Sequence, residues 1–107
     1  MCAGKLYTIF QPHTYSRTKL LMEDFVRSLR VVPNLMIYKT YPAREYFDEE
    51  GSALTLAKNV GNCLYSESIR ELKTWLKNTV QAGDIVLFLG AGDVYYAAQH
   101  LLKELNK

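Results

Sequence analysis

The sequence has few of the features that mark specialised classes of protein. Its 107 residues include only 2 cysteines, Cys2 and Cys63, in no CxxC or Cys/His spacing, so neither a disulfide framework nor a zinc site is indicated. The net charge of +2 is too small to indicate nucleic-acid binding. No apolar run approaches the roughly 18 residues of a membrane span, and no signal peptide is recognisable. We therefore expect a cytoplasmic protein with no metal, membrane or nucleic-acid partner.

The sequence instead alternates between strand-like and helix-like segments. The composition is 49% hydrophobic, and a chain of 107 residues is the size of one domain, so residues 1–107 are expected to share one core. Short apolar and β-branched runs predict strands. These runs are Lys5–Phe10, Leu35–Tyr41, Asn62–Tyr65 and Ile85–Leu89. The last run, IVLFL, is apolar throughout, which is typical of a central strand in a parallel sheet.

Helical spacing of apolar residues separates these runs. It predicts one helix over Arg17–Arg30 capped by Thr14 or Ser16, a short one from Ser52 to Val60, and a third opened by Ser66 or Ser68. A last helix would bury Val94, Ala98, Leu101 and Leu105. Strands alternating with helices predict an α/β fold, a three-layer Rossmann-like domain with a mostly parallel sheet. The strand order does not follow from this pattern.

Three connectors follow predicted strands, and ligand sites of open α/β sheets form at the carboxyl ends of strands. The connectors are QPHTYS, PAREYFDEEGS and GAGD. GAGD, residues Gly90, Ala91, Gly92 and Asp93, falls short of a dinucleotide fingerprint because Tyr95 occupies the third glycine position. Two interpretations remain open: an anion site at the start of the last helix, and a tight turn in which Asp93 is the N-cap.

The first connector carries His13 and Arg17 within nine crowded residues, FQPHTYSRT. A guanidinium can hold a carboxylate through two parallel hydrogen bonds, so this pair is a candidate site for a small anion. In the second connector, Arg44 and Glu45 are interpreted as a solvated pair, with loop contacts to a ligand as the alternative. Asp48, Glu49 and Glu50 are interpreted as solvated surface, and His100 as a surface residue of the last helix.

The ordered motifs FQPHTYSRT, YPAREYFDEEGSA and GDIVLFLGAGDV resemble the carboxy-terminal domain of the Mur ligases of bacterial cell-wall synthesis. The resemblance runs from about Lys5 to the end, and FQPH-x-YSRT points to the branch that joins L-alanine to UDP-N-acetylmuramate. It implies a domain that brings the amino acid and closes over the nucleotide. The complete enzyme would use ATP and Mg²⁺, an amino-terminal UDP-sugar domain and a central ATP domain.

Several residue roles follow from the resemblance alone. It makes His13 and Arg17 the amino-acid-site histidine and arginine, and Gly90 to Asp93 the loop near the substrate carboxylate. Thr14 stands where many members of the family have arginine, and Tyr15, like Thr14, is a candidate contact. No catalytic residue is assigned.

The sequence lacks a GxxxxGK[ST] P-loop and the Asp-Asp-Tyr-Gly-His-His segment that precedes the first motif in the family. We therefore expect the chain to be inactive alone, as an excised domain or one half of a split arrangement. Two other interpretations stay open: a non-catalytic α/β binding module, and the equivalent domain of a Mur ligase that adds another amino acid.

Overall fold

The computed structural model describes residues 4–90 and Gln99, and their elements alternate as the sequence predicts. The strands are β1 (Leu6–Phe10), β2 (Leu35–Tyr38), β3 (Leu64–Ser66) and β4 (Ile85–Leu89). The helices are α1 (Tyr15–Leu20), α2 (Met22–Leu29), the 3-10 turn η1 (Glu49–Gly51), α3 (Ala53–Val60) and α4 (Ile69–Thr79). The predicted last helix lies outside the described residues, apart from Gln99, which is helical.

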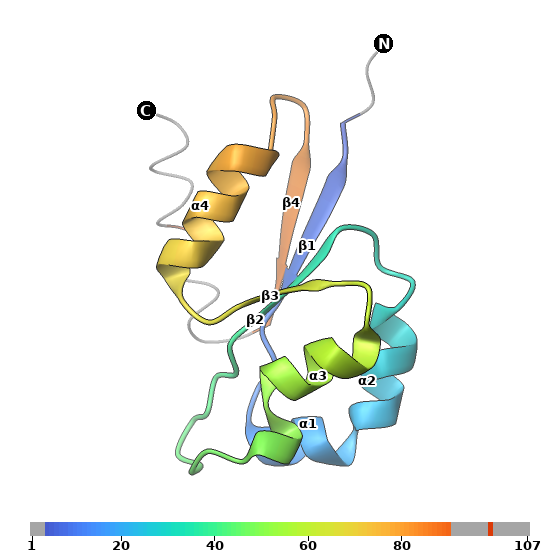
Figure 1. Cartoon of the computed structure of the whole chain (residues 1–107), viewed down its shortest axis with the longest axis vertical. Helices are drawn as coiled ribbons and strands as arrows, with labels where there is room; N and C mark the ends of the chain where they lie inside the picture. The colour runs from blue at the N-terminus through green and yellow to red at the C-terminus, as the bar shows by residue number, and fades with distance from the viewer. Residues whose placement is uncertain (1–3, 91–98, 100–107) are drawn as a thin grey trace.

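The strands form one sheet in the order β3-β2-β1-β4, and every described strand pair is parallel. The prediction of a mostly parallel sheet is therefore confirmed. The prediction that Ile85–Leu89 is central is wrong for the described sheet, because β4 lies at its edge, beside β1 (Figure 1). Alternate residues of β4 are exposed, Ile85 by 64%, which an edge strand permits despite its uniformly apolar sequence.

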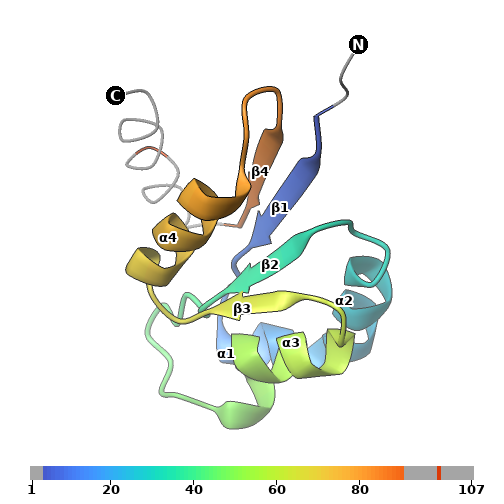
Figure 2. The ribbon, with the colours of Figure 1, turned by 45° about the horizontal axis from the view of Figure 1, so that its top comes forward.

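Helices cover both faces of the sheet, which confirms the three-layer Rossmann-like architecture. On one face, α4 packs Leu72 and Leu76 against Ile9 of β1. On the other face, α2 and α3 pack Leu29 and Leu56 against Ile37 of β2. Figure 2 shows α4 on one side of the strands and α1, α2 and α3 on the other.

Local hydrogen bonds explain where the helices begin. The Ser52 Oγ accepts a bond from the Thr55 N–H, and the Ser68 Oγ accepts one from the Glu71 N–H, so both hydroxyls act as N-caps. The predicted helix over Arg17–Arg30 is instead two helices. It breaks at Leu21, whose backbone (φ −104°, ψ 19°) leaves the helical region. None of the helices among residues 4–90 is long and apolar enough to cross a membrane.

Candidate functional site

The connector after β1 is fixed to both neighbouring strands by Gln11. Its backbone N–H donates to the Leu89 carbonyl of β4 at 2.9 Å, and its buried side-chain amide donates to the Lys39 carbonyl after β2 at 3.0 Å. These two bonds hold the start of FQPHTYSRT at the carboxyl edge of the sheet, the edge at which β1, β2 and β4 end.

His13 lies against the second connector. It forms an isolated parallel bridge with Tyr41, and the two rings stack with centroids 5.5 Å apart and an interplanar angle of 25°. Within the described part of the chain, the buried Nδ1 of His13 has no hydrogen-bond partner. A buried nitrogen without a partner is uncommon and is compatible with a ligand contact.

Thr14 joins the connector to α1 in an unusual conformation. Its backbone lies at φ 63° and ψ 151°, a region that is essentially restricted to glycine. Its N–H donates to the Tyr41 carbonyl at 2.8 Å, and its Oγ1 accepts from the Arg17 N–H at 3.3 Å as the N-cap of α1. Strain of this kind persists only where surrounding contacts impose it, and it concentrates at functional sites.

Arg17 is exposed in the first turn of α1, so its guanidinium is accessible to a small anion. The structure therefore brings His13, Thr14, Tyr15 and Arg17 together around one short turn at the carboxyl edge. Their assignment to a ligand site and their individual roles stay predictions.

The third connector begins beside the first. Gly90 follows β4 directly with φ 133°, a backbone angle that favours glycine. Ala91, Gly92 and Asp93 lie outside the described residues, so the two interpretations of GAGD stay open. The helices that follow β1 (α1 and α2) and the helix that precedes β4 (α4) lie on opposite faces of the sheet. The strand order reverses between the neighbours β1 and β4, which makes this the topological switch point, where open α/β sheets bind ligands.

The second connector is where the sequence interpretation needs correction. Arg44 is exposed, as expected, but Glu45 is not simply solvated: its carboxylate accepts hydrogen bonds from the Tyr15 and Ser16 N–H groups, at 2.7 and 3.0 Å, and from the Ser16 hydroxyl. These bonds hold the pKa of Glu45 below its usual range, the Ser16 hydroxyl contributing most. In the acidic run, Glu49 and Glu50 are exposed, as expected, and Asp48 is half-buried. Asp48 and Glu50 form surface ion pairs with Lys19.

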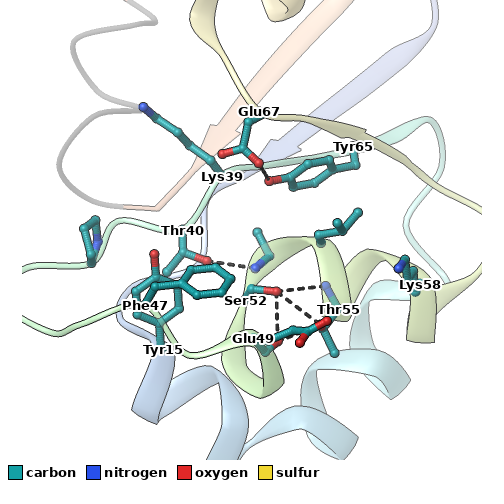
Figure 3. A pocket seen from close by; sticks show the side chains of 13 residues that line it. Tyr15, Lys39, Thr40, Phe47, Glu49, Ser52, Thr55, Lys58, Tyr65 and Glu67 are labelled. Carbon is teal, nitrogen blue, oxygen red and sulfur yellow. Dashed lines mark hydrogen bonds between the residues drawn. The ribbon is translucent and has the colours of Figure 1, made fainter.

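A cavity of about 590 Å³ at the carboxyl ends of β2 and β3 has no counterpart in the sequence-based predictions. Figure 3 shows Tyr65 and Glu67 across the cavity from the first turn of α3, with Tyr15 and Phe47 at one end and Lys58 at the other. The Tyr65 hydroxyl donates to the Glu67 carboxylate, and burial is the largest cause of the raised pKa of Tyr65. The apolar runs in the sequence predicted where these strands end. The placement of Tyr65 across the cavity from Ser52 depends on the strand order, which the sequence pattern does not specify.

The described residues do not form a metal site, since no three His, Cys, Asp or Glu side chains among them lie close enough to hold an ion. Cys63 is a free, partly buried thiol whose pKa is raised by burial. Neither observation points to metal or thiol chemistry in this part of the chain.

Comparison with known proteins shows what this α/β domain is similar to. No protein-family model matches the chain. The UDP-N-acetylmuramate–L-alanine ligase of Alkaliphilus metalliredigens is 40% identical over 105 residues, covering 94% of this chain and 22% of that protein. The ligases of the same name from Clostridium tetani and Aquifex aeolicus are each 38% identical over 94% of the chain.

The matches confirm the resemblance to a domain of the Mur ligases. The chain is a relative of one domain-sized part of the UDP-N-acetylmuramate–L-alanine ligases, and it spans about 22% of the length of the curated relatives it matches.

Proposed function

We propose that the chain is the amino-acid-binding, closing domain of an ATP-dependent ligase that joins L-alanine to UDP-N-acetylmuramate in peptidoglycan synthesis. The observation that carries the proposal is similarity over 94% of the chain to ligases of this name. The geometry agrees with it, because His13, Arg17 and Gly90 follow two adjacent strands at the topological switch point of the sheet.

In this proposal the chain binds and orients the amino acid. The Arg17 guanidinium takes the carboxylate of L-alanine through two charge-assisted hydrogen bonds, and His13, half-buried beside Tyr41, borders the same space. Holding the amine of alanine close to the carbonyl that it attacks is the contribution of the domain to the rate. The carboxy-terminal position in the complete ligase and the cytoplasmic location are parts of the same proposal.

ATP and Mg²⁺ belong to other domains in this proposal. The 107 residues contain no GxxxxGK[ST] sequence, and residues 4–90 contain no group of three or more His, Cys, Asp or Glu side chains that could hold a metal ion. In Mur ligases ATP supplies the activation of the carboxyl group. We assign no step of that activation to this chain, and we expect it to be inactive without the amino-terminal and central domains.

Binding of L-alanine to the chain tests the proposal directly. In a titration of the ¹⁵N-labelled chain followed by NMR, L-alanine is expected to shift the Arg17 Nε–H and His13 resonances. Arg17→Ala should weaken binding about 10- to 100-fold, which is the loss of affinity expected when a charge-assisted hydrogen bond is removed. Arg27→Ala, which removes an exposed arginine of α2 paired with Asp24, is the matched control and should leave binding unchanged.

A chimera extends the test to catalysis. In it, the chain replaces the matching 105 residues of the Alkaliphilus metalliredigens ligase. L-alanine-dependent phosphate release with a raised KM for alanine in Arg17→Ala supports the assignment. Equal KM values for Arg17→Ala and Arg27→Ala, or a preference for another amino acid in competition, would contradict it.

A further inference from the structure

The Glu45 carboxylate closes the start of a helix from which it is distant in sequence. Its Oε1 accepts from the Tyr15 N–H and the Ser16 N–H, and its Oε2 accepts from the Ser16 hydroxyl, 29 or 30 positions away along the chain. Tyr15 and Ser16 are the first two residues of α1, where N–H groups have no partner within the helix. The carboxylate therefore supplies hydrogen bonds that the helix cannot.

The same connector contacts Tyr15 at two further points. A Cβ at Gly51 would lie 2.0 Å from the Tyr15 carbonyl oxygen, so only glycine permits this approach of the two backbones. The rings of Phe47 and Tyr15 meet edge to face, with centroids 5.5 Å apart. Neither contact involves the Glu45 carboxylate, so they are independent indications that residues 41–52 are built against the start of α1.

The turn that these contacts fix, residues 13–17, is the one that contains the candidate site residues. Thr14, in its glycine-like conformation, separates His13 from Tyr15, and Arg17 follows in the same turn of helix. A strained turn relaxes unless contacts on both sides oppose the relaxation. The Tyr41 carbonyl holds the Thr14 N–H on one side, and Glu45 holds the next two N–H groups on the other.

We infer that Glu45 is a positioning residue of the amino-acid site: by capping α1 it fixes the strained turn at Thr14 and so the placement of His13 and Arg17 at the carboxyl edge. It also occupies the N–H groups at the start of α1, so the substrate carboxylate binds the Arg17 side chain and not the helix backbone. The identity of the ligand rests on the proposed function, whereas the capping contact stands without it.

Two variants of Glu45 separate its geometry from its charge. Glu45→Gln keeps a carbonyl oxygen that can accept from both N–H groups but removes the charge, while Glu45→Ala removes every bond. Glu50→Gln is the control, since Glu50 is an exposed acid of the same connector whose partner is Lys19. ¹⁵N-NMR spectra of the three variants of the 107-residue chain also report whether each remains folded.

In the wild type, the Tyr15 and Ser16 amide protons are expected to titrate together, with a midpoint below the usual range of a glutamate. In Glu45→Ala this titration disappears, the amides of Thr14 to Arg17 and the His13 ring shift, and the Kd for L-alanine rises at least about tenfold. Glu45→Gln also loses the titration, because an amide does not ionise. Its amide and His13 shifts and its Kd for L-alanine are expected to lie between those of Glu45→Ala and the wild type, because it retains the acceptor.

The inference is overturned if the Tyr15 and Ser16 amides do not report Glu45, or if Glu45→Ala moves the His13 and Arg17 signals no more than Glu50→Gln does. Failure of the proposed function has a different signature. In that case L-alanine shifts no resonance of the wild-type chain, while the amide titration still decides whether Glu45 holds the turn.

Discussion

Thr14 is the residue at which strain and candidate site coincide. Its φ of 63° and ψ of 151° cost a β-branched residue about 1–3 kcal/mol. Glycine adopts these angles freely, and replacing a threonine N-cap by glycine costs only a few tenths of a kcal/mol. Thr14→Gly is therefore expected to be at least as stable as the wild type, even after its greater loss of backbone entropy and the loss of the bond to the Arg17 N–H. Thr14→Ala keeps the strain and loses the N-cap bond to the Arg17 N–H, so it should be less stable by about 1 kcal/mol.

Urea unfolding of the two variants checks this order. The wild type is the reference, and the position of each midpoint at constant slope gives the change in stability. Finding Thr14→Gly less stable than Thr14→Ala would mean that the turn is not strained.

A second prediction at this scale concerns acid stability. The Asp84 carboxylate accepts from the Lys5 N–H and from the Gln81 N–H, both at 2.8 Å, and these bonds lower its pKa in the folded state. Because the folded pKa lies below the unfolded one, this stabilisation is complete above the usual aspartate pKa and is lost as pH falls through the folded pKa. Glu45 acts in the same direction.

Thermal unfolding between pH 7 and pH 2.5 is the measurement. Asp84→Asn is expected to lower the Tm at neutral pH and to reduce the fall in Tm on acidification. The exposed Asp24→Asn is the control. A wild-type and an Asp84→Asn profile that stay parallel would show that Asp84 does not contribute.

The sequence predicts single residues well where their partners are close along the chain. Thr14, Ser52 and Ser68 are N-caps as expected, since each bonds an N–H three residues later. The bonds of Glu45 join residues 29 or 30 positions apart, and no local pattern records them. The interpretation of Glu45 as solvated therefore failed for a physical reason, namely that its partners are set by the tertiary fold.

At the scale of elements, the faces of the sheet and its β4 edge differ in how much their side chains contribute to stability. Ile9 of β1 is 0% exposed against α4, so Ile9→Ala is expected to cost about 2–5 kcal/mol. Ile85 of β4 is 64% exposed, so Ile85→Ala removes the same atoms and should cost less than about 1 kcal/mol.

Urea denaturation of this matched pair measures the difference. Ile9→Val, with an expected cost of about 0.5–1.5 kcal/mol, extends the test if Ile9→Ala does not fold. Similar costs for Ile9→Ala and Ile85→Ala would contradict the exposure of the Ile85 side chain.

The sequence predicted which helices and strands exist, but it did not predict which strands pair with each other in the sheet. The apolar runs predicted all four described strands, and the spacing of Leu72 and Leu76 predicted α4. The apolar sequence IVLFL is compatible with a central strand and with this edge strand, because hydrophobicity does not specify which strands pair. The break at Leu21 is likewise a backbone event that an uninterrupted helical spacing does not record.

At the scale of the whole molecule, the strand order gives the candidate site its location. The motif FQPHTYSRT and the GAGD sequence are separated by more than 70 positions, yet their strands are adjacent, with Phe10 opposite Leu89. Parallel pairing brings both carboxyl ends to one edge, which is why a site can be built there. The sequence identified both connectors, and the order β3-β2-β1-β4 supplied their proximity.

The pairing of β1 with β4 also sets a sequence of events for folding. Lys5 and Asp84, which meet at the start of this pair, are 79 positions apart, so the loop that the pairing closes is among the longest that this chain can form. The contacts of β1 with β2 close a much shorter loop and can form earlier. On the ribosome, β1 must therefore remain paired on one side only until residues 85–89 have emerged, and the bond from the Gln11 N–H to the Leu89 carbonyl, which ties the first connector to β4, can form only then.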